Sequence, residues 1–454
     1  MDEKDEVIPP SSGSKSSTLI EDDANRPVED QKAATGEREE IEGQPPAPSG
    51  PPGPPPDGGL VAWLQVVGGF SLFFNTWGLM NTFGVFQTYY ESGALFVASS
   101  SSISWIGSTQ SFLALFMGIV VGPIYDRGYL RALLCVGSFL VVFGLMMLSL
   151  CTEWWQVFLA QGLCVGIGAG CLFTPCVSIM PTYFRRRLGL AQGISVAGSS
   201  LGGVIYPIVL YQLLDRIGFA WTVRVLGFIA LVTLIVPIVV MRMRFKAAKP
   251  RALIDPASLR DVPYITFVLS SLIGFMGLTV ALFYVSFFGE ASMIVDSRMS
   301  FYLVPILNAA SCFGRAAPAA LSDKTGPFNI IAPATVIFGV VSFSMQAVRS
   351  EAALIVLTVL IGFFSGVLVA MPPICLAALT ENKALLGTRI GMAFGVISFG
   401  MLAGGPGAGS ILGDAPPFNW TGVWSFGGAT ATFAGLMYAG LRVARAGVRI
   451  NIKA

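Results

Sequence analysis

The sequence predicts an all-α membrane protein, and three features of the 454-residue chain support this prediction. First, 54% of the residues are hydrophobic and 12% are charged, whereas soluble domains carry about 25% charged residues. Second, the apolar residues form runs of about 20, the length with which a helix crosses the hydrocarbon core of a bilayer. Third, one glycine-rich apolar stretch occurs twice, which indicates a duplicated unit.

The duplicated stretch contains six small residues that recur at one constant offset of about 200 positions. The first copy holds Gly189, Ala191, Gly193, Gly198, Gly202 and Gly203, and the second holds Gly391, Ala393, Gly395, Gly400, Gly404 and Gly405. Glycine in a membrane helix lets a neighbouring backbone approach closely. A repeat of this length predicts two homologous halves that enclose a central cavity.

Residues 1–56 are predicted to form a disordered cytoplasmic tail. They are acidic and serine-rich, and they end in a proline-rich run. Such a composition cannot bury enough apolar area to offset the loss of chain entropy on folding. The segment also lacks the basic n-region and apolar h-region of a signal peptide.

Twelve membrane spans are predicted from Leu60 onward. Their approximate bounds are 60–88, 100–122, 130–150, 155–180, 188–212, 222–241, 264–288, 300–321, 328–348, 352–379, 388–412 and 422–443. The basic stretch 242–263 is the predicted linker. It separates an N-terminal six-helix bundle (57–241) from a C-terminal one (264–443), and residues 444–454 form a cytoplasmic tail. The predicted architecture is therefore two pseudo-symmetric six-helix bundles.

The distribution of cations predicts the orientation of these spans. With the N-terminus inside, inner loops hold about four times as many cations as outer loops, in agreement with the positive-inside rule. Both termini are then cytoplasmic, and the plasma membrane is the expected location, with a vacuolar or other internal membrane as the alternative. Asn419 begins the sequon Asn-Trp-Thr in an outer loop, so it is a candidate glycosylation site.

Several function classes are not expected from this composition. The chain has no histidine, and its seven cysteines lie in or beside apolar runs without metal-site spacing. The glycines between Gly162 and Gly170 lack the preceding strand that a phosphate-binding fingerprint requires. We therefore expect no metal, no cofactor, no enzymatic activity and no nucleic-acid partner. The expected partners are the lipid bilayer and a small molecule.

Two loops at matching places in the two halves carry the same arrangement of charges. The first contains Asp126, Arg127 and Arg131, and the second contains Asp323 and Lys324. Each puts a carboxylate at the inner end of a helix, followed by a cation and a glycine turn. This pattern resembles the cytoplasmic signature loop of the major facilitator superfamily. The resemblance implies that these five residues gate the inner side, while the alternative is a pair of loops that merely obey the positive-inside rule.

Two further motifs resemble the monocarboxylate-porter branch of that superfamily, in its fungal form. They are the stretch Asp57-Gly58-Gly59 that leads to Trp63, and Tyr183-Phe184-Arg185 before the fifth span. The resemblance extends from Asp57 to the end of the chain. It implies the major facilitator fold, a monomer, and secondary transport of small organic acids or related metabolites by alternating access.

Arg315 is the main candidate for a substrate contact. It lies inside the eighth span, about two turns before Asp323. A cation at membrane depth is costly unless it faces a partner or a wet cavity, and the planar guanidinium suits a carboxylate. The resembled family has an arginine at the corresponding place that engages the substrate carboxylate. The alternative is that Arg315 extends to the inner surface and joins Asp323.

The remaining site residues are predicted from their places in the spans. Animal relatives carry an acid where this chain has Ser311 and a lysine where Asn81 is the best match, so simple proton symport is in doubt and a coupling proton is left open. Several polar side chains occur within spans: Asn75, Asn81, Gln87, Gln110, Gln161, Gln192, Tyr284 and Asn308. Asn81, Asn308 and Ser311 join Arg315 as predicted substrate contacts, because the first and eighth spans line the cavity in the resembled fold.

The leading functional hypothesis is a secondary transporter for an organic anion or carboxylate-bearing metabolite, with secondary-metabolite efflux favoured. The first alternative is uptake of a monocarboxylate or a vitamin. The second is a nutrient receptor on the same fold that does not transport.

Overall fold

The computed structural model describes residues 55–185, 187–244, 253–381 and 385–447, and only the backbone of Asp323. Most of the predicted tail of residues 1–56 lies outside the described residues. The same holds for residues 245–252 of the predicted linker and for most of the predicted C-terminal tail. The predicted bounds of these segments and of the two bundles therefore stay predictions.

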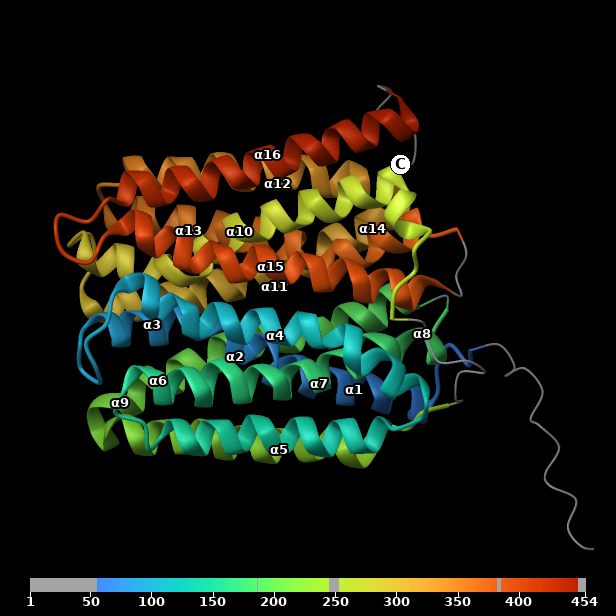
Figure 1. The fold of residues 1–454 in the computed structure, drawn as a ribbon, viewed down its shortest axis with the longest axis horizontal. Helices are drawn as coiled ribbons and strands as arrows, with labels where there is room; N and C mark the ends of the chain where they lie inside the picture. The colour runs from blue at the N-terminus through green and yellow to red at the C-terminus, as the bar shows by residue number, and fades with distance from the viewer. Residues whose placement is uncertain (1–54, 186, 245–252, 382–384, 448–454) are drawn as a thin grey trace, which may run out of the picture. The chain divides into compact units, whose positions relative to one another are not determined.

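The described chain is almost entirely helical, and its long helices run side by side (Figure 1). The N-terminal bundle consists of α1 (Leu60–Asn75), α2 (Trp77–Asn81), α3 (Phe83–Glu91), α4 (Ser100–Asp126), α5 (Leu130–Leu148), α6 (Trp154–Val157), η1 (Phe158–Val165), α7 (Gly166–Ser178), α8 (Met180–Tyr183) and α9 (Leu188–Val240). The C-terminal bundle consists of α10 (Val262–Ala291), α11 (Ser297–Thr325), α12 (Phe328–Ser344), α13 (Glu351–Ala370), α14 (Pro372–Leu379), α15 (Leu386–Leu412) and α16 (Trp420–Ala446). Short 3-10 turns occur at η2 (Ser258–Arg260) and η3 (Met345–Ala347).

These elements make twelve crossings within the described residues. Nine helical segments are long and apolar enough to cross a membrane. One of them, α9, has 53 residues and consists of two helices, because Gly218 interrupts it with φ 73° and ψ 170°. The helices α11 and α16 are also long enough to cross, with 29 and 27 residues. The observed helix ends lie within a few residues of the predicted ones.

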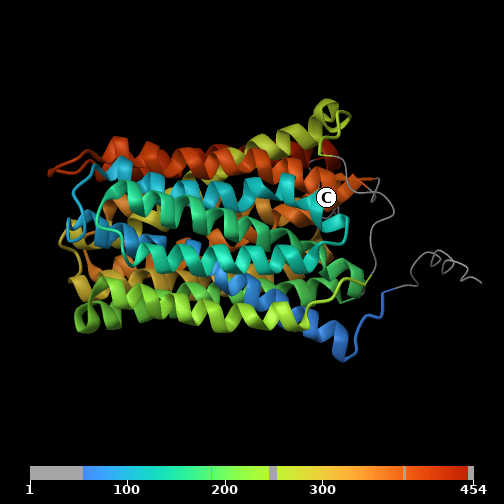
Figure 2. The same cartoon turned by 60° about the horizontal axis from the view of Figure 1, so that its bottom comes forward.

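The crossings alternate in direction, so the connections gather at two ends (Figure 2). We call one of them the Asp126 end, because α4 finishes there at Asp126. The α11–α12 connection lies at this end too. The other is the Glu91 end, where α3 finishes at Glu91 and α11 begins at Ser297.

The first crossing is broken twice, and a threonine stands at each break. The Thr76 hydroxyl donates to the carbonyl of Leu72 at 2.9 Å, and the Thr82 hydroxyl donates to the carbonyl of Gly78 at 2.8 Å. Such back-bonding competes with the regular helix ladder and bends the helix. The short α2 between the two breaks is fully buried.

The repeated glycines make equivalent contacts in the two bundles. A Cβ on Gly198 would overlap the carbonyl oxygen of Phe70 in α1, and a Cβ on Gly400 would overlap the carbonyl oxygen of Leu272 in α10. Both the glycines and their partners are 202 positions apart. Gly202 and Gly404 repeat the relation one turn further on, against the carbonyl oxygens of Phe74 and Met276. This one set of backbone contacts, made twice, confirms the predicted pseudo-symmetry.

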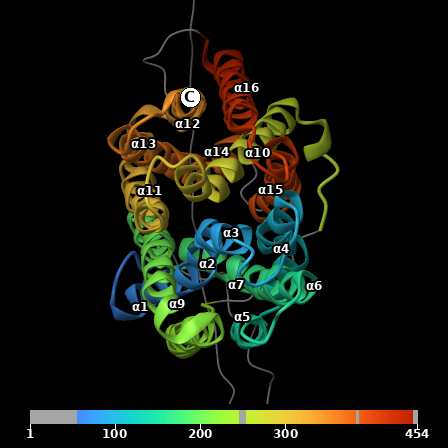
Figure 3. The same ribbon diagram turned by 90° about the vertical axis from the view of Figure 1, so that its left-hand side faces the viewer.

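The two bundles meet along α4 with α15, α9 with α11, and α3 with α10 (Figure 3). Near the Glu91 end, the Ser101 hydroxyl donates to the carbonyl of Pro406 at 3.2 Å. The amide of Gln212 donates to the Tyr302 hydroxyl at 3.1 Å, and the hydroxyls of Ser104 and Tyr284 contact each other. These three contacts join the bundles near the Glu91 end.

Candidate substrate site between the bundles

Arg315 is buried where the two bundles meet. Its side chain is 5% exposed, and its Nη1 group donates to the hydroxyl of Ser199 in α9. Its Nε group is buried without a hydrogen-bond partner, and no described side chain forms an ion pair with it. An unpaired guanidinium at this depth is costly. The burial argues against the alternative in which Arg315 reaches the inner surface, although the side chain of Asp323 is outside the description.

Glycine packing sets the direction in which Arg315 points. The preceding residue, Gly314, lies against the carbonyl of Phe363 in α13 with no room for a Cβ. Successive residues in an α-helix are about 100° apart around its axis. The Gly314 side of α11 therefore faces α13, inside the C-terminal bundle, and the next residue turns to α9 in the other bundle.

Asn308 and Asn81 lie close to the same junction. Asn308 is fully buried against Gly203 of α9, where a Cβ would lie 2.5 Å from the amide group. Its Nδ2 donates to the carbonyl of Val304 at 3.0 Å, and its Oδ1 has no partner. Val304 packs beside Gly84, one turn from Asn81 in the neighbouring bundle. The Nδ2 group of Asn81 is likewise buried without a partner.

The structure divides seven of the eight polar residues named above into two groups, and the eighth, Gln192, is half-buried in α9. Four have internal partners: Asn75 binds Tyr206 and Thr233, Gln161 binds Tyr90, Gln87 binds Glu91, and Tyr284 binds Ser104 and the carbonyl of Gly405. Three have a buried atom without a partner: Asn81, Gln110 and Asn308. Buried polar atoms are nearly always paired, so the exceptions call for an explanation. These three atoms are therefore candidates for contact with a ligand.

Ser311 lies apart from these groups. It is 1% exposed, and both its backbone oxygen and its hydroxyl lie against Gly366 of α13. It lies on α11, as Arg315 does, but these contacts lie within the C-terminal bundle. Its role in substrate binding stays a prediction.

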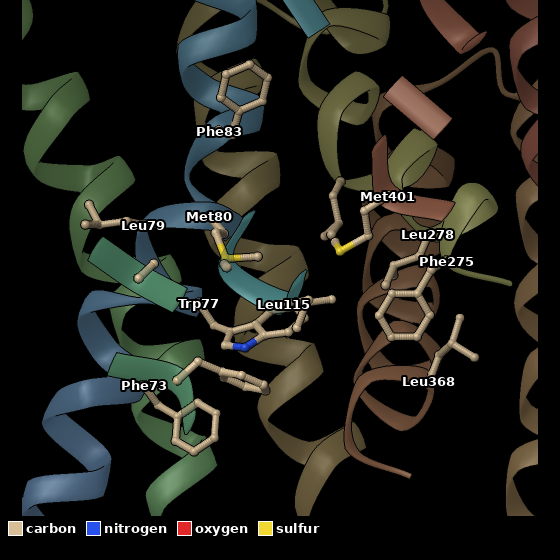
Figure 4. Packing of buried hydrophobic residues seen from close by; sticks show 14 of the residues in the cluster. Phe73, Trp77, Leu79, Met80, Phe83, Leu115, Phe275, Leu278, Leu368 and Met401 are labelled. Atoms are coloured by element: carbon tan, nitrogen blue, oxygen red, sulfur yellow. The ribbon is translucent and has the colours of Figure 1, made fainter. Parts of the chain in front are cut away.

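Apolar side chains pack around the junction (Figure 4). On the left of this view, the N-terminal bundle contributes Phe73, Trp77 and Met80. On the right, the C-terminal bundle contributes Phe275, Leu278 and Met401. Both bundles therefore contribute apolar side chains here, and small-molecule sites are lined mostly by such side chains.

The predicted gate residues lie at the Asp126 end. Asp126 is 8% exposed at the last position of α4, while Arg127, Arg131 and Lys324 are exposed. The side chain of Asp323 is outside the description. The gating role of these five residues therefore stays a prediction. The predicted glycosylation site Asn419 caps α16 at the other end, where its side chain accepts from the backbone N–H of Gly422 at 2.9 Å.

Sequence reasoning missed two contacts at the Asp126 end. The guanidinium of Arg389 pairs with the carboxylate of Asp261 and stacks over the ring of Tyr264 at 4.6 Å. In the other bundle, the carboxylate of Asp57 accepts from the backbone N–H of Arg185 at 2.5 Å. This bond joins the two motifs that resemble the monocarboxylate-porter branch. In the sequence, only the charge of these side chains pointed to such contacts. The partners could not be matched because they are 128 positions apart in both cases.

Comparison with known proteins establishes the family. Residues 66–346 match the model of the Major Facilitator Superfamily. The chain is 62% identical over 381 residues to the MFS-type transporter dbaD of Emericella nidulans. The aligned region covers 84% of this chain and 86% of that protein. It is 36% identical to the aspyridones efflux protein apdF of Emericella nidulans, over 86% of this chain and 79% of that protein.

A solved structure agrees on the fold. The nucleoside transporter NupG, as its D323A mutant, superposes with a TM-score of 0.64 over 84% of this chain and 99% of that chain, at 14% identity. At this identity the likeness speaks for the fold alone. The chain belongs to the major facilitator superfamily and is a membrane transporter. Its described residues make twelve crossings in two bundles.

Proposed function

We propose that the protein exports an organic anion, a carboxylate-bearing secondary metabolite, by alternating access of the site around Arg315. The observation that carries this proposal is the buried guanidinium of Arg315, which has an unpartnered Nε and no described ion pair. A carboxylate supplies both the missing charge and the missing acceptor. Efflux is favoured over uptake because one relative is named as an efflux protein.

The orientation and the membrane belong to the same proposal. Described arginines and lysines concentrate at the Asp126 end, so the positive-inside rule places that end in the cytoplasm. The Glu91 end then faces outward, and its interbundle contacts form the closed outer gate. We place the protein in the plasma membrane as a monomer, with a proton as the candidate coupling ion.

An untargeted comparison of metabolites inside and outside cells, with and without this gene, tests the direction and the chemical class. We expect loss of the gene to raise an organic acid inside the cells and to lower it in the medium. The opposite change would indicate uptake of a monocarboxylate or vitamin. Binding of a labelled acid to the purified protein without flux into proteoliposomes would indicate a receptor.

The gate proposal predicts a separation of turnover from recognition. Changing Asp126 to Asn removes a charge at the end of α4, outside the substrate site. We expect the transport rate to change while the ranking of competing substrates stays as in the wild type. Asp215→Asn, at an exposed position near the Glu91 end, serves as the matched control. A changed ranking in Asp126→Asn would contradict the gate role.

A further inference from the structure

Three aromatic rings, drawn from both bundles, surround Phe173 of α7. The centroid of its ring is 6.3 Å from that of Phe73, 6.3 Å from that of Trp77 and 5.9 Å from that of Phe394. Phe73 and Trp77 belong to the first crossing, and Phe394 belongs to α15 of the C-terminal bundle. The ring contact between Phe173 and Phe394 therefore crosses the junction between the bundles.

This ring cluster lies at about the depth of Arg315. Arg315 is ten residues from the end of α11 at the Asp126 end, which corresponds to about 15 Å along the helix. Phe394 is eight residues from the end of α15 at the same side, or about 12 Å. Arg315 also binds Ser199, the neighbour of Gly198, whose contact in α1 is one turn from Phe73.

The cluster lies on the side of the junction that faces the interior of the protein. A second pair of rings, Phe112 of α4 and Phe399 of α15, also joins the bundles, with a centroid distance of 5.0 Å. Phe399 is 48% exposed, whereas Phe173 is 9% and Phe394 is 5% exposed. The next residue along α7, Thr174, has a buried hydroxyl without a hydrogen-bond partner. Aromatic side chains with a few polar groups nearby are typical of small-molecule sites.

We propose that the rings of Phe73, Trp77, Phe173 and Phe394 bind the flat, conjugated part of the transported anion, while Arg315 holds its negative group. This inference rests on the proposed function and narrows it to aromatic or conjugated acids. The contact between Phe173 and Phe394 must open when the bundles separate. The two ring surfaces exposed in that step can contact a planar group of the substrate. Stacked or edge-on ring contacts then contribute favourable binding energy.

Binding of two matched acids to the purified full-length protein in nanodiscs tests the inference. Naphthalene-2-carboxylate is flat, and decahydronaphthalene-2-carboxylate has the same carbon skeleton without the conjugated rings. We expect the wild type to bind the flat acid about two- to tenfold more tightly, since ring pairs contribute this much beyond buried area. Phe173→Leu and Phe394→Leu are expected to lose this preference. Phe399→Leu changes a ring on the exposed side of the junction and is expected to keep the preference for the flat acid.

The possible results separate the inference from the proposed function. The wild type could bind both acids equally tightly, and Arg315→Gln could lose the affinity for both. That result would overturn the ring site and would still support the anion site at Arg315. If Phe173→Leu and Phe394→Leu lost affinity for both acids equally, the rings would serve helix packing only, and the ring site would also be overturned. If the wild type bound neither acid, the ring site and the carboxylate site would both be rejected.

Discussion

Replacing Arg315 with Gln is expected to weaken the binding of an organic acid by about 2–5 kcal/mol, the usual cost of removing one partner of a buried charged hydrogen bond. This corresponds to a loss in affinity of at least about 30-fold. The reason is that Arg315 is the buried cation at the junction of the bundles and lacks a described ion pair. Arg315→Lys keeps the charge but loses the planar fork, so it should bind with intermediate affinity.

The measurement compares an acid with its neutral amide, for example naphthalene-2-carboxylate with naphthalene-2-carboxamide. If Arg315 recognises the carboxylate, the variants lose affinity for the acid and change little for the amide. Arg349→Gln is the matched control, because Arg349 is an exposed arginine of the C-terminal bundle that donates to backbone carbonyls. Equal losses for acid and amide would assign Arg315 to the gate.

The second large effect is expected from Gly198→Ala. The added methyl group would overlap the carbonyl of Phe70, so α9 and α1 must move apart. Overpacking of this kind costs about 1–3 kcal/mol. We expect a clear drop in the thermal unfolding temperature of the purified protein, read from the loss of its monodisperse peak in size-exclusion chromatography after heating. Gly400→Ala should behave in the same way, because Gly400 makes the equivalent contact.

The repeated stretch itself supplies the control. A Cβ on Gly193 would meet nothing within 4 Å. Alanine is favoured over glycine inside a helix by about 0.5–1 kcal/mol, so Gly193→Ala should leave the unfolding temperature unchanged or raise it. Should Gly193→Ala and Gly198→Ala lower that temperature equally, the close approach at Phe70 would not be the cause.

Hydropathy and the repeat were enough to predict the fold. Twelve apolar runs and one 202-residue offset are properties of the chain alone, and the bilayer leaves helices as the way to satisfy their backbone groups. Hydropathy did not reveal the breaks at Thr76 and Thr82. A threonine bonds back to the preceding turn at each break, but Thr279 and Thr335 form the same bond in helices that continue. The bond alone therefore does not determine where a helix breaks.

The candidate site was predicted only in part. Arg315 stood out in the sequence because a charge within an apolar run is rare. Asn75 and Asn308 are both asparagines within apolar spans, and only the family resemblance singled out Asn308. In the structure Asn75 is bonded to Tyr206, while the Oδ1 of Asn308 has no partner. This difference depends on the rotation of each helix about its axis. The pairing of Arg389 with Asp261 depends in the same way on how α10 and α15 pack together.

The glycine contacts have a consequence for how the halves of this molecule can diverge. Gly198 and Gly400 each meet a main-chain oxygen and not a side chain. The residues that supply these oxygens, Phe70 and Leu272, differ in shape and chemistry. Substitutions at such positions leave the docking of the helices intact, so a duplicated ancestor could acquire a different interior in each half without losing its framework.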